Sequence, residues 1–118
     1  FGCGGDRDRG KRPMMGKVSV DYSDRVIVTS DNPRSEDPRS IINEVLIGTA
    51  GSGKPVEAID DRSSAIRAAV AEAREGDIVA IAGKGHEDYQ EAGGVKRHFS
   101  DIEEAGKALQ DAEVGYQD

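Results

Sequence analysis

Residues 26–42, VIVTSDNPRSEDPRSII, follow the pattern of a strand, a polar loop and a helix. Val26-Ile27-Val28 is an apolar run between polar residues, which predicts a buried strand over residues 25–29. Asp37-Pro38 then begins a helix that we expect to reach about residue 47, with an inner face of four apolar residues, Ile41, Ile42, Val45 and Leu46. Open α/β sheets bind ligands at the carboxyl ends of their strands. The loop at residues 29–38 is therefore a predicted ligand site.

The side chains of this loop suit a charged ligand. Asn32 precedes Pro33, so its backbone is biased towards an extended conformation. Arg34 offers a planar fork of N–H donors that matches a carboxylate or a phosphate. Asp31 and Asn32 can cap local amides or accept hydrogen bonds from a ligand ammonium, and the local sequence does not choose between these uses. A turn with a surface arginine is the alternative interpretation.

Length, charge and cysteine content limit the class of protein. The 118 residues fit one domain, and the net charge of -7 argues against a nucleic-acid partner. Cys3 is the only cysteine, which suits a reducing cytoplasm and predicts neither a disulfide nor a metal site. No apolar run is long enough to span a membrane. The opening FGCGG, residues 1–5, resembles the end of a strand entering a glycine-rich loop, so we expect a fragment of a longer protein.

The glycine-rich segment at residues 4–12 carries more basic than acidic residues. Its basic side chains are Arg7, Arg9, Lys11 and Arg12. An anion site and a solvated loop are equally good interpretations. Pro13 suits the start of a helix, and we expect the helix to face the sheet through four residues at helical spacing, Met14, Met15, Val18 and Tyr22.

Residues 48–54 imitate a nucleotide-binding motif. They match the first seven positions of a P-loop, G-x-x-x-x-G-K, but Pro55 stands where the metal-binding Ser or Thr is required. A P-loop also follows a strand and opens a helix, whereas this run follows a helix and precedes a strand predicted at residues 56–59. We interpret it as a flexible linker.

The next segments predict another helix and a central strand. Asp60-Asp61 caps a helix that ends at Glu75-Gly76. Residues 77–82 are almost entirely apolar, which is typical of a central parallel strand. Gly83 and Glu87 then lie in a loop at the end of that strand, where Glu87 is the natural partner for a ligand ammonium group. His86, in the same loop, has no identifiable carboxylate partner.

The last third of the chain predicts a hairpin and a helix. Gly93-Gly94 separates two alternating runs within residues 89–99, as in a hairpin near a sheet edge. Ser100 and Glu103 form a capping box for a helix whose inner face we expect at Ile102, Ala105 and Leu109. We place the domain at residues 1–112 and a frayed tail at residues 113–118. The predicted fold is α/β, a Rossmann-like, doubly wound and mostly parallel sheet with a C-terminal edge hairpin.

Three motifs together resemble a known family. They are GCGGDRDRGKRP at residues 2–13, TSDNPRSEDPRSII at residues 29–42 and AGKGHEDYQ at residues 82–90. In order and spacing they are similar to the C-terminal domain of the Mur ligases, in particular those that add meso-diaminopimelate to UDP-N-acetylmuramoyl-L-alanyl-D-glutamate in peptidoglycan synthesis. The similarity runs from Phe1 to about Ser100.

The resemblance implies an ATP-dependent ligase that joins an amino acid to an acyl phosphate formed on the nucleotide substrate. Asn32 and Arg34, in a loop with Asp31 and Pro33, would hold the end of meso-diaminopimelate distant from the attacking amine. Arg7 would bind a carboxylate. The distal ammonium would meet the Gly83 carbonyl and Glu87. Lys11 and Lys84 are candidates for contacts with nucleotide phosphates.

The resemblance assigns ATP, Mg²⁺ and the UDP-N-acetylmuramoyl dipeptide mainly to domains that have no counterpart in this sequence. We therefore expect no catalytic residue in this chain and no ligation by the chain alone. Two alternatives remain at this stage. One is a stand-alone amino-acid-binding or regulatory module. The other is part of a ligase for lysine or another diamine, and the guanidinium fork of Arg34 argues against this second alternative.

Overall fold

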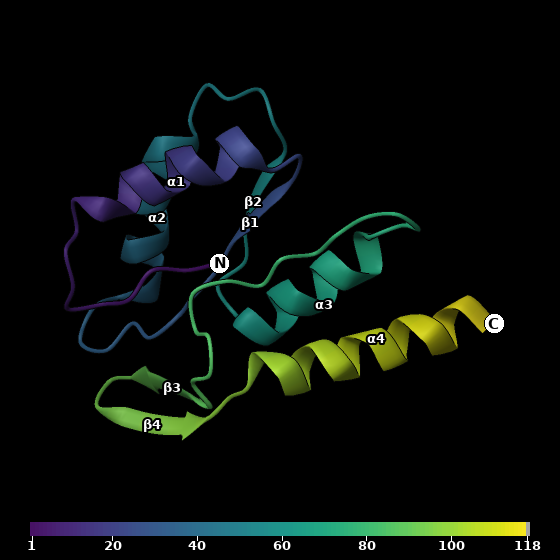
Figure 1. Cartoon of the computed structure of the whole chain (residues 1–118). Coiled ribbons are helices and arrows are strands. Elements are labelled where there is room, and N and C mark those ends of the chain that lie inside the picture. Colours follow the sequence, from purple (N-terminus) through teal and green to yellow (C-terminus); the bar gives the residue numbers. More distant parts are fainter. Residues whose placement is uncertain (118) are drawn as a thin grey trace.

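Two pairs of helices lie on opposite sides of a short parallel sheet in the computed structural model, which describes residues 1–117 and the side chains of residues 1–113 (Figure 1). The elements in chain order are α1 (Lys11–Tyr22), β1 (Val26–Val28), α2 (Pro38–Thr49), β2 (Val56–Ala58), α3 (Arg62–Glu72), β3 (Tyr89–Ala92), β4 (Val95–His98) and α4 (Asp101–Gln117).

The parallel sheet consists of β1 and β2, with Val26 opposite Val56 and Val28 opposite Ala58. On the other edge of β1, the Thr29 N–H donates to the Phe1 carbonyl at 2.8 Å, and the Phe1 amine donates to the Ile27 carbonyl at 3.1 Å. The predicted α/β class is confirmed. The predicted doubly wound sheet is not, because the parallel sheet of the described residues has two strands.

The central strand predicted at residues 77–82 is wrong. This segment has no ladder partner among residues 1–117, and Ile78 is 93% exposed. It borders an open groove of about 600 Å³ whose opposite wall includes Ile27 of β1 and Ile66 of α3. An apolar run becomes a strand only when its backbone groups find partners, and composition does not reveal whether they do.

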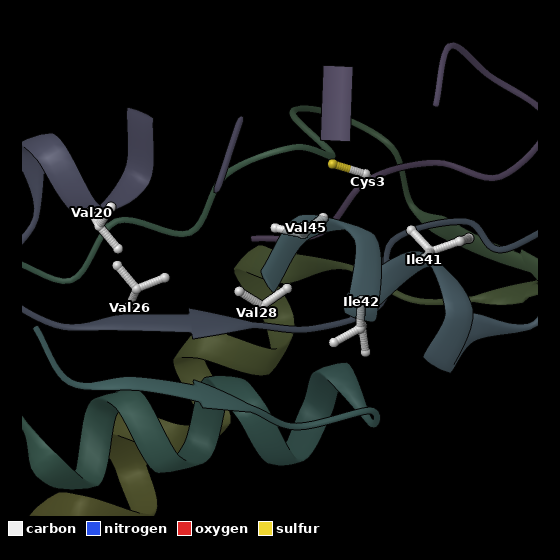
Figure 2. Packing of buried hydrophobic residues seen from close by; sticks show 7 residues of the cluster. All are labelled: Cys3, Val20, Val26, Val28, Ile41, Ile42 and Val45. Atoms are coloured by element: carbon white, nitrogen blue, oxygen red, sulfur yellow. The ribbon is translucent and has the colours of Figure 1, made fainter. Parts of the chain in front are cut away.

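The main core lies between α1, α2 and β1. Its buried residues are Cys3, Val20, Val26, Val28, Ile41, Ile42 and Val45, and Figure 2 shows how their side chains converge. The inner face predicted for α2 is confirmed, since three of its four residues are buried and Leu46 packs against them. The helix begins as predicted, with Pro38 in the first turn and the Asp37 carboxylate accepting from the Arg39 N–H at 3.3 Å.

The face predicted for α1 is wrong. Its four expected core residues are exposed, by 65% for Met14, 42% for Met15, 56% for Val18 and 87% for Tyr22. A Cβ atom on Gly16 would lie 2.1 Å from the Val45 carbonyl oxygen, and one on Gly48 would lie 1.8 Å from the Pro13 carbonyl oxygen. The backbones of α1 and α2 therefore touch through these glycines, and this contact decides which side of α1 is buried.

A second cluster, Ile66, Phe99 and Ala108, joins α3 to α4. The expected inner face of α4 is wrong at two of its three residues, because Ile102 is 80% exposed and Leu109 61%. The helix continues to Gln117 through most of the predicted tail, and Asp118 lies outside the described residues. No helix of the described chain is both long enough and apolar enough to cross a bilayer.

The predicted hairpin is confirmed as β3 and β4, with Gly93-Gly94 in the turn at φ +57° and +79°. It forms a sheet of its own and does not extend the edge of the β1–β2 sheet. A single parallel bridge between Arg34 and Ala92 attaches it to the loop after β1. The linker predicted at residues 48–54 is confirmed for residues 50–54, which connect α2 to β2, whereas Gly48 and Thr49 are the last residues of α2.

Candidate functional site

The loop after β1, residues 29–37 (the Asn-Pro loop), packs directly on the N-terminal glycine-rich segment. The Gly5 N–H donates to the Asn32 carbonyl at 2.7 Å. A Cβ atom on Gly2 would lie 2.3 Å from the Thr29 carbonyl oxygen, and one on Gly5 would lie 1.8 Å from that of Pro33. Only glycine allows the two backbones to come this close.

The hairpin holds the Asn-Pro loop from the other side. The Arg34 N–H donates to the Glu91 carbonyl at 3.0 Å, and the Gly93 N–H donates to the Arg34 carbonyl at 2.8 Å. Gln90 Nε2 also donates to the Asp31 carbonyl at 2.8 Å. These bonds keep Arg34 at φ +53°, a backbone conformation that costs free energy for a non-glycine residue. The sequence analysis did not find this role of the hairpin, since no local pattern encodes it.

The Arg34 guanidinium is partly available to a ligand. Its Nη1 atom donates to the Gly5 carbonyl at 2.9 Å, whereas Nε and Nη2 donate to no described residue. A Cβ atom on Gly4 would lie 2.9 Å from Arg34 Nη1 and 3.6 Å from Arg7 Cγ. Arg7 and Arg34 therefore border the same space above Gly4. The Arg7 guanidinium donates to the Asp6 carbonyl at 3.0 Å, and the unused donors of Arg34 suit a carboxylate or a phosphate.

An acceptor lies beside these donors. Glu87 Oε1 accepts from Asn32 Nδ2 at 3.2 Å, and Oε2 accepts from the Tyr89 hydroxyl at 3.4 Å. The Glu87 side chain is 36% exposed, so it can still receive a cation. Gly83, at φ +114°, lies close to the Gly2 carbonyl. The tertiary structure thus brings three of the predicted motifs to one place.

The two candidate phosphate-binding lysines differ in their surroundings. Lys84 is fully buried, and its ammonium lies 2.9 Å from Asp31 Oδ1. Lys11 is exposed in the first turn of α1, and its side chain contacts no ion-pair partner among the described residues. His86 is also exposed. The phosphate contacts stay a prediction, but the Lys84 ammonium already has protein partners.

Arg12, which we grouped with the basic residues of the glycine-rich segment, is a structural residue. Its side chain is 1% exposed and forms ion pairs of 2.7 Å with Glu36 and 2.5 Å with Glu44. It also donates to the Gly4 carbonyl at 3.0 Å. Hydrogen bonds from Arg12, and secondarily from the Asp6 N–H, lower the pKa of Glu36 to about 2. Arg9 pairs with Glu44, so much of the local positive excess is neutralised within the protein.

No group of three or more His, Cys, Asp or Glu residues is arranged to hold a metal ion in the described part of the chain. The linker lysine is likewise used in the fold, since Lys54 Nζ donates to the Val20 carbonyl. At the candidate site, Arg34 and Glu87 place a donor and an acceptor of opposite charge on either side of Asn32.

Comparisons with known proteins agree in family and fold. Residues 1–85 match the family described as Mur ligase, glutamate ligase domain. Similar proteins include the UDP-N-acetylmuramoyl-L-alanyl-D-glutamate--2,6-diaminopimelate ligases of Chromobacterium violaceum, 59% identical over 109 residues, and of Lactiplantibacillus plantarum, 55% identical over 108 residues. Both alignments cover 92% of this chain and 22% of the relative.

A solved structure of a ligase with the same name superposes with a TM-score of 0.91 at 50% identity, covering 96% of this chain and 23% of that one. The chain therefore spans about a fifth of the length of these relatives.

Proposed function

This chain belongs to the Mur ligase family, and we propose that it is the amino-acid-binding C-terminal domain of an ATP-dependent ligase that adds meso-diaminopimelate to UDP-N-acetylmuramoyl-L-alanyl-D-glutamate. The product of this reaction serves peptidoglycan synthesis. The relatives that bear the name of this ligase support the reaction class, and the chemistry of the site supports the choice of amino acid.

The observation that carries the proposal is the pairing of opposite charges around Asn32. Arg34 offers guanidinium donors on one side, where the Arg7 side chain borders the same space, and Glu87 offers a carboxylate acceptor 3.2 Å from Asn32 Nδ2. The distal end of meso-diaminopimelate carries one carboxylate and one ammonium group. Each group therefore has a complementary partner in the site.

Lysine lacks the distal carboxylate, so its binding would leave the Arg34 donors unpaired. Each charge-assisted hydrogen bond lost in this way costs on the order of 1.5–3 kcal/mol. We propose that this difference in affinity makes the ligase select meso-diaminopimelate over lysine.

ATP and Mg²⁺ belong, in this proposal, to the remaining part of the longer ligase, together with the UDP-N-acetylmuramoyl dipeptide. The described residues do not fit either group by themselves: no cluster of metal ligands is present, and the run that resembles a P-loop is a linker. The chain's own task is to bind and orient the amino acid. We further propose that the complete domain is Rossmann-like and doubly wound, and that the ligase is cytoplasmic and acts on no nucleic acid or membrane.

Calorimetric titration of the chain with meso-diaminopimelate, with L-lysine as the control ligand, tests the proposal. Selective binding of meso-diaminopimelate is the expected result. If the folded chain binds neither, the titration is repeated on the full-length protein with its nucleotide substrate. Failure of both to bind would contradict the proposal, and equal binding of both amino acids would contradict the selectivity.

Arg34→Ala supplies the residue-level test. It should weaken meso-diaminopimelate binding by about 10-fold to 100-fold, because the distal carboxylate loses charge-assisted hydrogen bonds. Arg67→Ala is the matched control, since Arg67 is an exposed arginine of α3 whose guanidinium, among the described residues, donates to Ser63 alone. Unchanged affinity in Arg34→Ala would show that this arginine does not bind the ligand.

A further inference from the structure

Lys84 is a buried charge that the proposed function does not use. Its side chain is 0% exposed, and its ammonium has three close partners. Nζ donates to Asn32 Oδ1 at 3.0 Å and to the Tyr89 carbonyl at 2.9 Å, and it forms the 2.9 Å ion pair with Asp31. Nζ also lies 3.9 Å from Glu87 Oε1, so acceptors of the protein surround this fully buried ammonium.

The contacts of Lys84 determine which way the Asn32 amide faces. Asn32 is 1% exposed, and one of its side-chain atoms receives both the Lys84 ammonium and the Glu91 N–H, each at 3.0 Å. An atom that faces two donors must be the oxygen, because the amide nitrogen carries hydrogens. The amide nitrogen then faces Glu87.

A rotated amide would be unfavourable in these surroundings. It would set the NH₂ group against the Lys84 ammonium and the Glu91 N–H, and it would set the oxygen against the Glu87 carboxylate. The positive charge of Lys84 is compensated within the protein by Asp31 at 2.9 Å and, more distantly, by Glu87 at 3.9 Å. Lys84 also connects two segments 52 residues apart in the sequence.

We propose that Lys84 is a positioning residue for ligand selection: it holds Asn32 with its amide N–H groups directed to the side of Glu87, where they can donate to a ligand carboxylate. The inference rests on the proposed function, since it assumes that the ligand carries a carboxylate at this point. Lys84 acts through Asn32 and does not touch the ligand.

A double-mutant cycle in the full-length ligase tests whether Lys84 acts through Asn32. The steady-state KM for meso-diaminopimelate is measured in the unmutated protein, in Lys84→Met, in Asn32→Ala and in the double variant. Lys84→Met alone should raise KM about tenfold or more, whereas in the Asn32→Ala background the same change should alter KM less than about twofold. Lys107→Met, at an exposed lysine of α4, is the control and should behave as the unmutated protein.

Equal effects of Lys84→Met in both backgrounds would overturn the inference, because a merely structural role is independent of Asn32. An unchanged KM in Lys84→Met would overturn it as well. If the unmutated ligase does not add meso-diaminopimelate at all, the proposed function fails first. The two failures are therefore distinguishable.

Lys84→Met leaves the Asp31 carboxylate without its ion-pair partner and can fail to fold for that reason. The cycle is then run in an Asp31→Asn background, which removes the unpaired charge. A second measurement, of NOEs from the Asn32 side-chain amide, needs no variant of Lys84. In the unmutated chain, the Asn32 side-chain amide protons should give NOEs to the Glu87 side chain, and NOEs to the Glu91 amide proton instead would overturn the assigned orientation.

Discussion

Two buried arginines, Arg12 and Arg62, hold together the segments that form and surround the site. Arg12 joins the glycine-rich segment to Glu36 of the Asn-Pro loop and to Glu44 of α2. Arg62, also 1% exposed, donates to the Ser30 and Ala82 carbonyls and forms a 2.8 Å ion pair with Asp101. Each guanidinium has enough donors to satisfy several acceptors at once, so one side chain can hold three segments together.

The Arg12–Glu36 pair predicts a pH dependence of stability. The pKa of Glu36 is lowered from an ordinary 4.5 to about 2 in the folded protein. As the pH falls below about 4.5, the unfolded chain takes up a proton that the native protein resists. The stability contributed by this pair is therefore fully present above pH 4.5 and is lost between pH 4.5 and 2.

Glu36→Gln should therefore flatten the acid limb of the stability curve. Urea unfolding at pH 6 and pH 3 measures the effect: the free energy of unfolding should fall less in Glu36→Gln than in the unmutated chain. Glu75→Gln is the control, because Glu75 is exposed and has no ion-pair partner among the described residues. If the free energy of unfolding falls equally between pH 6 and pH 3 in Glu36→Gln and in the unmutated chain, the prediction is contradicted.

Among the elements, the contact between α1 and α2 depends most sharply on single residues. The two helices touch through Gly16 and Gly48, where a Cβ atom would lie within 2.1 Å of a backbone oxygen. Backbone atoms cannot move aside as a flexible side chain can. The α1–α2 pair also positions Arg12 and Glu44, so this packing helps to hold the glycine-rich segment that borders the site.

Gly48→Ala should therefore destabilise the chain by about 2 kcal/mol or more, since the methyl group forces the helices apart. Gly106→Ala is a matched control within α4: nothing lies within 4 Å of its Cβ position, and alanine should stabilise the helix by about 0.5–1 kcal/mol. Urea unfolding of both variants gives the difference. A Gly48→Ala protein as stable as the unmutated chain would refute the close contact.

For the whole molecule, the proposed function assigns amino-acid binding to this chain and the chemistry of ligation to the rest of a longer ligase. Donors and acceptors for a zwitterionic ligand gather where the glycine-rich segment, the Asn-Pro loop and the loop at residues 83–89 meet. In multidomain enzymes of this kind, closure of one domain on another completes the catalytic arrangement.

We accordingly predict that the 118-residue chain alone forms no amide product from meso-diaminopimelate, ATP, Mg²⁺ and the UDP-N-acetylmuramoyl dipeptide. Mass spectrometry of the reaction mixture checks this, with the full-length ligase as the positive control. ATP-dependent product formation by the chain alone would refute the prediction.

Local sequence was enough to predict most of α2, the β3–β4 hairpin and the connection from α2 to β2 at residues 50–54. Capping residues, turn glycines and helical spacing act within a few residues of one another, so their effect can be read along the chain. The loop motifs of the site were recognised for a similar reason, because each lies within one short segment. Their assignment as ligand-binding residues stays a prediction.

Contacts between segments far apart in the sequence decided the features that were predicted wrongly or not at all. The buried face of α1 depends on glycine contacts with α2, and the segment at residues 77–82 is not a strand because its backbone has no ladder partner among the described residues. The roles of Arg12 and Lys84 depend on carboxylates 24 or more residues away in the sequence, as the pairs Arg12–Glu36 and Lys84–Asp31 show. A charged side chain in a loop looks the same in sequence whether solvent or an ion pair surrounds it, so only the folded chain distinguishes a ligand-binding residue from a structural one.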